Sequence, residues 1–257
     1  MSTAVKRGAA TRGQVAQRLD GVDAIEIKAT IPDHQIDAAL DHFKLSIDND
    51  EERAIYFFDT PDLDLFKAGM IARARRIVGE EGDSTVKFRP VVPADVPQDW
   101  RKYEGFKLEA DASEGGVVKS ASLTMPLENS LIKQVVAGDK GIAKLFTQEQ
   151  EDFLAAIGKQ HIDYDTLNVL GPLQAHRWKF DDPACPWRIT AELWKRQDGG
   201  RLMEMSIKVP VVQAAVAMAG FMAFLVEVGA ERDSEQQTKT RWALDHHSAL
   251  LRDTRPA

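Results

Sequence analysis

The sequence predicts an α+β chain with a mostly antiparallel sheet, and three observations lead to this prediction. Seven short segments alternate polar and apolar residues with a period of two, which is typical of strands with one polar and one apolar face. Three further segments have the length and apolar spacing of helices. The sequence QDGGR at 197–201 has the residues of a tight hairpin connection. More strands than helices, joined in part by such turns, favour antiparallel pairing with helices packed against the sheet.

In chain order, the predicted strands are 25–30, 70–76, 84–89, 106–111, 175–180, 188–194 and 202–209. The first predicted helix, 33–43, carries an acidic residue in its first turn. The second begins after Thr147, a favourable N-cap, and ends at Gly158. The third, 211–228, is strongly apolar, but Pro210 precedes it, and we expect a buried core helix rather than a membrane span.

Composition and charge exclude several classes of protein. Of the 257 residues, 44% are hydrophobic and 28% are charged, which excludes a disordered chain and a collagen-like fibre. A single cysteine, Cys185, cannot form a disulfide within the chain. The net charge of −7 disfavours a nucleic-acid partner, because phosphate backbones select basic surfaces. The basic residues near the start are followed by no apolar core, so we expect a flexible basic tail over 1–21 and a cytoplasmic protein without a membrane partner.

Charged side chains share one face of each predicted strand, because residues two apart in a strand point the same way. The like-charged pairs among them are Arg73 with Arg75, Lys87 with Arg89, and Arg177 with Lys179. Residues 67–107 hold nine basic and six acidic side chains, a local charge of +3 in a chain whose total is −7. A half-buried sheet with a solvated face alternates in the same way. Like charges side by side repel, however, and so favour an anion bound between them.

A few carboxylates share these charged faces, namely Glu26, Glu109, Asp111, Glu192 and Glu204. Carboxylate oxygens are ligands for hard cations such as Mg²⁺, and arginine and lysine bind phosphate oxygens. Together they have the composition of a metal–polyphosphate site. If the charged faces line the inside of a closed barrel, the apolar faces point outward, and the helices must cover them.

At these residues the sequence resembles the CYTH superfamily, the triphosphate tunnel metalloenzymes, which includes class IV adenylate cyclases, thiamine triphosphatases and inorganic triphosphatases. The strongest match is YFFDTPDLDLFKAGMIARARR at 56–76. Further matches in the same order are STVKFRP, GFKLEAD, GPLQAHRWKF, RITAELWKRQDGG, LMEMSIKV and TKTRWAL. The resemblance implies an eight-stranded antiparallel β-barrel with a polar interior, covered outside by helices. It implies one tunnel domain over 22–245, an expanded helical part near 112–170, and a C-terminal tail over 246–257.

The resemblance also implies roles for the charged residues. Those that it assigns to phosphate binding are Arg73, Arg75, Lys87, Arg89, Arg177, Lys179, Lys208 and Lys239. Lys28 is assigned phosphate binding and a catalytic part in activating water, and Asp111 a supporting place in the tunnel. Those assigned to Mg²⁺ or Mn²⁺ are Glu26, Glu109, Glu192 and Glu204. The implied ligand is a triphosphate-containing small molecule or polyphosphate, and the oligomeric state stays open.

Two positions depart from the family pattern. The first acidic position of the opening strand is Ala24, and the second acidic position of the late strand is Ser206. Asp23 is adjacent to Ala24, but strand alternation turns it to the opposite face. Each departure removes a metal ligand, so three functions stay open: a metal-dependent triphosphatase, a binding module that does not cleave its ligand, and an adenylate cyclase.

Some conspicuous residues are expected to be structural. Asp59 and Asp62 lie in a turn-like sequence, where aspartate accepts hydrogen bonds from backbone amides. His246 and His247 lack the spacing of a zinc site, and we expect them at a solvent-exposed helix end.

Overall fold

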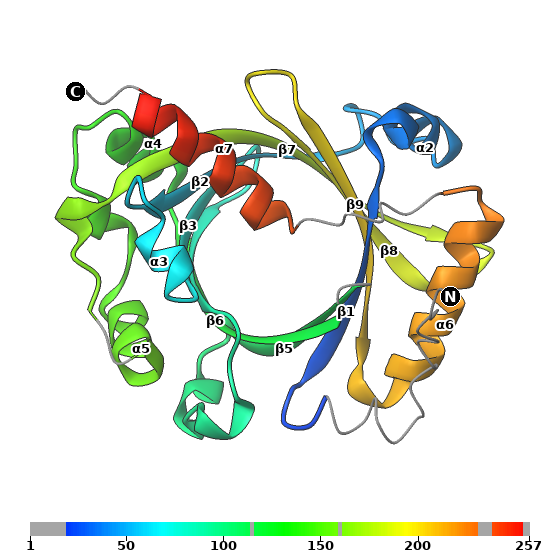
Figure 1. The fold of residues 1–257 in the computed structure, drawn as a ribbon, viewed down its shortest axis with the longest axis horizontal. Helices are drawn as coiled ribbons and strands as arrows, with labels where there is room; N and C mark the ends of the chain where they lie inside the picture. The colour runs from blue at the N-terminus through cyan, green and yellow to red at the C-terminus, as the bar shows by residue number, and fades with distance from the viewer. Residues whose placement is uncertain (1–18, 114–115, 159–160, 231–237, 254–257) are drawn as a thin grey trace, which may run out of the picture.

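The computed structural model describes residues 19–113, 116–158, 161–230 and 238–253. Most of the expected N-terminal tail therefore lies outside the described residues. Nine strands close into a barrel. The strands are β1 (Ala24–Ile31), β2 (Glu51–Asp59), β3 (Met70–Ile77), β4 (Gly82–Phe88), β5 (Phe106–Ser113), β6 (Gly116–Leu127), β7 (Asn168–Asp182), β8 (Cys185–Lys195) and β9 (Arg201–Pro210). Figure 1 looks along the barrel, with the strands surrounding its opening.

The order of strands around the barrel is β1-β5-β6-β4-β3-β2-β7-β8-β9, and β9 pairs with β1 to close it. Eight of the nine neighbouring pairs are antiparallel, while β1 and β5 run parallel. The predicted α+β barrel is confirmed, but two details of the prediction are wrong: there are nine strands rather than eight, and one pair is parallel.

The helices of four or more residues are α2 (Ile36–His42), α3 (Asp64–Lys67), α4 (Asn129–Val136), α5 (Gln148–Gly158), α6 (Ala214–Glu227) and α7 (Lys239–Asp253). Short 3₁₀ turns are η1 (Asp33–Gln35), η2 (Pro93–Asp95), η3 (Gln98–Lys102), η4 (Ile142–Leu145), η5 (Tyr164–Thr166) and η6 (Val211–Gln213). In Figure 1, α2 and α6 lie outside the barrel on one side and α4 and α5 on the other. None of the described helices is long and apolar enough to cross a membrane.

Two apolar clusters explain why these helices pack on the outside. The outward faces of β1, β8 and β9 form one cluster with α2 and α6, whose Phe221 is fully buried there. The outward faces of β2 to β6 form the other with α4 and α5, where Ile132 and Phe153 are fully buried. Burying such side chains is worth roughly 1.5–3 kcal/mol each. The apolar side chains of each alternating strand thus pack against the helices outside the barrel, and the charged side chains face inward.

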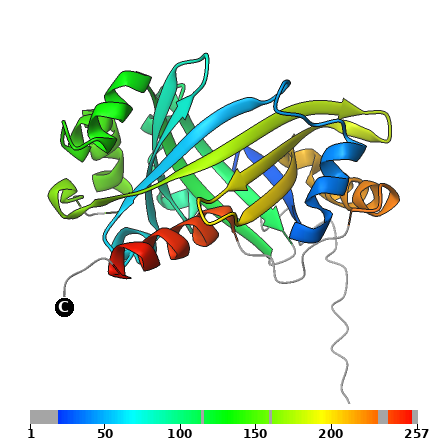
Figure 2. The same ribbon diagram turned by 90° about the horizontal axis from the view of Figure 1, so that it is seen from above.

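Helix α7 lies across one end of the barrel, as the two views show (Figures 1 and 2). Its buried Ala243 and Leu244 pack against a third apolar cluster that includes Ile55, Phe57 and Trp194. His247 is only 6% exposed. The expected C-terminal tail over 246–257 and the solvent-exposed histidine pair are therefore wrong for this part of the helix, because an apolar face of α7 packs on the barrel.

Two strands of the barrel, β2 and β6, were not predicted from the alternation of polar and apolar residues. In β2, Ile55 and Phe57 point to one face and Tyr56 and Phe58 to the other, and all four are buried, so polarity does not alternate. In β6, small serine and threonine side chains take the inward positions, which gives a weak contrast with the apolar face. β6 occupies the start of the segment expected to be helical, 112–170, whose later part does hold α4 and α5.

Candidate functional site

The barrel encloses a cavity of about 320 Å³ that is lined by side chains from all nine strands and by the start of α7. Its cationic lining residues are Lys28, Arg53, Arg73, Arg75, Lys87, Arg89, Lys107, Arg177, Lys208 and Lys239. Its carboxylates are Glu26, Glu109, Asp111, Glu192 and Glu204. The lining therefore has ten cations against five carboxylates, in a chain whose total charge is −7.

The cavity brings together twelve of the thirteen residues that the resemblance assigned to catalysis, phosphate or metal. The exception is Lys179, which is exposed and outside the lining. It follows Arg177 by two positions and shares its strand face, but it lies near the end of β7, beyond the enclosed part of the barrel. Lys179 therefore does not line the cavity, and its contact with phosphate stays a prediction.

Four arginines from the adjacent strands β3, β2 and β7 form what we call the arginine wall: Arg73, Arg75, Arg53 and Arg177. Arg75 donates to both oxygens of Asp83, with Nη2 2.6 Å from Oδ2. Arg73 donates to the hydroxyl of Thr85 at 3.3 Å, and its Nε is buried without a hydrogen-bond partner among the described residues. Arg73 is thus a half-buried guanidinium on the cavity lining, and its Nε has no partner within the described part of the chain.

The charge of Arg73 is costly where it lies. Burial, and then repulsion from Arg75, lower the pKa of Arg73 to about 9. The side chain still carries its positive charge at neutral pH. An anion bound beside it would offset the cost of burying that charge.

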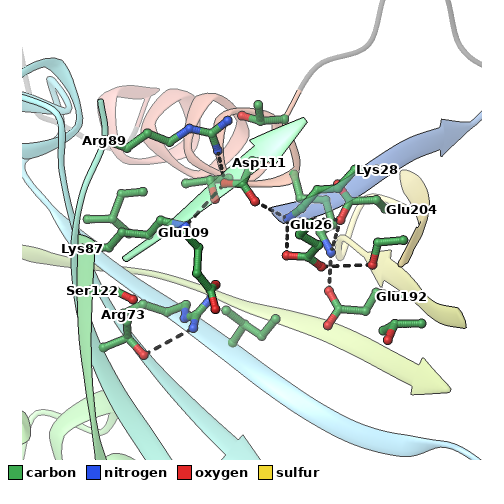
Figure 3. A pocket seen from close by; sticks show the side chains of 18 of the residues that line it. Glu26, Lys28, Arg73, Lys87, Arg89, Glu109, Asp111, Ser122, Glu192 and Glu204 are labelled. Carbon is green, nitrogen blue, oxygen red and sulfur yellow. Dashed lines mark hydrogen bonds and ion pairs between the residues drawn. The ribbon is translucent and has the colours of Figure 1, made fainter. Parts of the chain in front are cut away.

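The opposite side of the cavity, on β8, β9, β1 and β5, is a mixed wall that we call the lysine–carboxylate wall (Figure 3). It comprises Lys28, Lys239, Glu26, Asp111, Glu192 and Glu204. Lys28 Nζ lies 3.0 Å from Glu26 Oε2, 3.1 Å from Asp111 Oδ1 and 3.7 Å from Glu204 Oε1. Lys239 Nζ lies 2.9 Å from Glu204 Oε1 and also contacts Glu192.

The pKa shifts on this wall follow from the pairing. Burial alone would lower the pKa of Lys28, but Glu204, Glu26 and Asp111 together outweigh it and raise the pKa well above its ordinary value. Burial alone would raise the pKa of Asp111, but Lys28, Lys87 and Arg89 outweigh it and lower the pKa. Lys28 is therefore protonated at neutral pH and does not suit the role of taking a proton from water.

Sequence reasoning missed Arg53 and gave Asp111 only a supporting place. Arg53 is 5% exposed and contacts Glu51 and Glu192, yet the strand around it has no alternation that would have set it apart. Asp111 is a junction between the walls, with Lys87 at 3.6 Å and Arg89 at 3.3 Å in addition to Lys28. The acidic spacing of Glu109 and Asp111 was the available signal for it.

Local backbone features position several of these groups. The buried carboxylate of Asp59 accepts the backbone N–H groups of Thr60, Leu65 and Phe66 at 2.7–2.9 Å and so caps α3, as expected for this turn. Gly69 follows α3 with a φ of +78°, and its carbonyl accepts the N–H of Arg89 at 2.8 Å. A Cβ at Gly69 would lie 2.8 Å from the Arg89 carbonyl oxygen. The turn therefore needs glycine to bring Arg89 to the tunnel.

The carboxylates have the right chemistry for Mg²⁺ or Mn²⁺, but their arrangement does not form a metal site. Within the described ranges, no three His, Cys, Asp or Glu side chains are grouped so that they could hold a metal ion. The ammonium groups of Lys28 and Lys239 lie between the acids instead. Asp23 does not replace the missing acid at Ala24, since it pairs with Arg101 at 2.6 Å outside the cavity lining.

Comparison with known proteins gives structural relatives but no sequence relatives. No family model matches the sequence, and no curated protein matches it. A crystal structure of a "putative adenylate cyclase" from Bacillus halodurans is similar with a TM-score of 0.59 and 14% identity, covering 86% of this chain and 97% of that one. A "putative adenylyl cyclase" from Hippeastrum, described as having a dominant triphosphatase activity, is similar with a TM-score of 0.60 and 15% identity, covering 91% and 97%.

These likenesses extend over most of this chain and nearly all of each neighbour. At such low identity they establish the architecture and not the reaction. This chain therefore shares its barrel fold with these two proteins, which is the kind of fold that the resemblance to the CYTH superfamily implied.

Proposed function

We propose that the tunnel binds a triphosphate-containing small molecule and hydrolyses one of its phosphoanhydride bonds. The observation that supports this most is the excess of five positive charges on the cavity lining. Asp83 and Glu51, which pair with Arg75 and Arg53 from beyond the lining, reduce the excess only to three. Buried cations that have no counter-ion are costly, and a multiply charged phosphate chain would neutralise several of them at once.

The lining also suits the chemistry of phosphoryl transfer. The transition state is loose, and catalysis consists mainly of positioning the phosphates and neutralising the charge that develops on the leaving oxygens. Arg73 and Lys87 carry cationic donors on adjacent antiparallel strands, where they can contact neighbouring phosphate groups. Dependence on Mg²⁺ or Mn²⁺ stays a prediction from the resemblance.

One structural neighbour favours hydrolysis over cyclisation. The Hippeastrum protein is described as a putative cyclase with a dominant triphosphatase activity, and it has the same fold. In this chain, Ile55, Phe57 and Trp194 give part of the cavity an apolar lining, next to the place where α7 packs. No described feature singles out a pocket for a nucleobase, so adenylate cyclase stays the weaker alternative.

Phosphate release from inorganic triphosphate tests the proposal. The protein is assayed with Mg²⁺, with Mn²⁺ and with EDTA, beside Lys87→Ala and Glu204→Gln. We expect release by the natural protein and a loss of at least tenfold in Lys87→Ala, because a charge-assisted contact to phosphate is worth about 1.5–3 kcal/mol. With ATP as substrate, orthophosphate supports hydrolysis, while pyrophosphate with a cyclic nucleotide would establish the cyclase.

A second candidate, a module that binds polyphosphate without cleaving it, is favoured by one specific contact. Ser206 stands where the resemblance has an acid, and its hydroxyl donates to Glu26 Oε1 at 3.0 Å. The site has therefore replaced a potential metal ligand with a group that occupies another ligand's oxygen. Tight binding of triphosphate without any phosphate release, under all three metal conditions, would establish this alternative and overturn hydrolysis.

A further inference from the structure

Every carboxylate on the cavity lining already has a cation of the chain beside it. Lys28 contacts Glu26 and Asp111, and Lys239 contacts Glu204 and Glu192. Glu109, which lies apart from this group, pairs with Lys208. Both central lysines are well enclosed, with side chains 20% and 13% exposed. The acids expected to bind metal are thus neutralised from within the protein.

The positions of the two ammonium groups matter as much as their charge. Lys28 Nζ has three carboxylates within 3.7 Å, which matches the three donors of an ammonium. Lys239 Nζ reaches Glu204 from the other side, so that this acid lies between two lysines. A divalent ion held by Glu26 and Glu204 would have to displace these contacts. Figure 3 shows Lys28 among the carboxylates of β1, β5 and β9.

Two inward positions that could add ligands do not. Ala24 precedes Glu26 on the same strand face, and Ser206 lies opposite Lys28 on β9. Mg²⁺ and Mn²⁺ sites depend on the number of oxygen ligands and on their charge. With an alanine and a serine at these positions, each acid present has a cation of the protein beside it, and no unpaired acid of the described lining is left for a metal.

On the arginine wall, by contrast, one cation has no paired acid in the described part of the chain. Arg73 has no carboxylate within ion-pair distance among the residues that the structure describes, and its Nε has no partner. Charge for an anion is therefore available from the protein alone. A metal ion would not be needed to bring a polyanion into this cavity.

We propose that Lys28 and Lys239 act as built-in counter-cations of the tunnel carboxylates, so that the tunnel binds a triphosphate anion without a divalent metal ion. The inference rests on the proposed function, since it concerns the same ligand in the same cavity. It departs from the metal dependence that the family resemblance implies.

Calorimetric titration with inorganic triphosphate tests this, once in EDTA and once in excess Mg²⁺. We expect binding in EDTA to be at least as tight as in Mg²⁺, because Mg²⁺ that is bound to triphosphate cancels part of the anion's charge. Binding that is tenfold or more tighter in Mg²⁺ would overturn the inference but leave the proposed function standing. Binding in EDTA without phosphate release under any condition would overturn hydrolysis and leave the inference standing. No binding in either buffer would overturn both.

A gain-of-ligand variant supplies a second, independent readout. The double variant Ala24→Glu with Ser206→Glu adds two carboxylates to the lysine–carboxylate wall. The matched control, Ser122→Glu with Thr124→Glu, adds two carboxylates on β6 of the same cavity. Titration with Mn²⁺ alone should show at least tenfold tighter binding in the first variant than in the natural protein, and no comparable gain in the control. Natural protein that binds Mn²⁺ as tightly as the first variant would contradict the inference.

Discussion

The two walls of the tunnel use the same kinds of charged side chain in opposite ways. On the lysine–carboxylate wall, each ammonium lies among carboxylates at 2.9–3.7 Å, and the pairing raises the pKa of Lys28. On the arginine wall, Arg73 lies beside other arginines, and burial with repulsion from Arg75 lowers its pKa. On the first wall every acid has a cation of the protein beside it, while the second wall has more cations than acids.

The paired charges of the lysine–carboxylate wall therefore serve stability, and the excess charge of the arginine wall serves function. A cation that neutralises several buried acids stabilises the fold, because its removal leaves those acids uncompensated. A buried cation without an acid costs stability, and proteins retain such groups where function requires them. Removing one positive charge should therefore have opposite effects on the two walls.

The largest expected effect is on the lysine–carboxylate wall. Lys28→Met keeps most of the side-chain volume and removes the charge that lies between Glu26, Asp111 and Glu204. Breaking a buried ion pair by removing one partner costs about 3–5 kcal/mol, and the remaining cations near Asp111 and Glu204 favour the lower figure. We expect the free energy of unfolding, measured by urea denaturation at pH 7, to fall by about 3 kcal/mol. An unchanged urea midpoint would show that the wall is not held by this pairing.

The matched change on the arginine wall is Arg73→Met. It removes a half-buried guanidinium that has no described carboxylate within ion-pair distance, so we expect the unfolding free energy to stay the same or to rise by about 1 kcal/mol. Triphosphate binding should weaken by ten- to a hundredfold, since a charge-assisted hydrogen bond is lost. Urea denaturation and calorimetry on the same preparation measure both quantities. Destabilisation as large as that of Lys28→Met would abolish the distinction between the walls.

The sequence made the inward charges predictable because alternation and charge coincide in most strands. Arg73 and Lys87 each share a face with a like charge, and the opposite face is apolar. Arg53 was not predicted, because the residues that follow it in β2 are apolar on both faces and show no alternation of polar and apolar side chains. The parallel pairing of β1 with β5 could not be predicted, since it joins segments about 80 residues apart that share no local turn. The lysine contacts also depend on this closure, which brings Asp111 beside Glu26.

Acid titration should distinguish the tunnel from the apolar region under α7. Burial, and then repulsion from His246 and Arg196, lower the pKa of His247 to about 4, against an attraction from Asp198. The unfolded state then binds a proton at higher pH than the folded state, so the contribution of neutral His247 is present above about pH 6.5 and is lost as the pH falls toward 4. We expect about 1 to 2 kcal/mol less stability at pH 5 than at pH 7 from this residue.

The comparison of natural protein with His247→Gln, by urea denaturation between pH 7 and pH 5, isolates that contribution. His42→Gln, at an exposed position on α2, is the control. The unfolding free energy of His247→Gln should change less between pH 7 and pH 5 than that of the natural protein. The control, His42→Gln, should change as much as the natural protein. The tunnel acids Asp111 and Glu192 have lowered pKa values, so they should stay ionised through this range and add little. An equal change of the unfolding free energy with pH in all three proteins would mean that His247 is not held neutral by its surroundings.

The smallest expected effect is that of a residue just outside the cavity, and it tests where the phosphate-binding part of the tunnel ends. Arg177 and Lys179 share one strand face and the same sign of charge, and sequence reasoning assigned both to phosphate. The structure places Arg177 in the cavity, 3.6 Å from Glu192, and Lys179 outside it and exposed. Arg177→Ala should therefore weaken triphosphate binding at least tenfold, while Lys179→Ala should change it by less than twofold at 0.15 M salt, where an exposed charge is screened beyond about 8 Å. If both variants weaken binding equally, the phosphate chain extends past the end of β7, and the functional site is larger than the enclosed cavity.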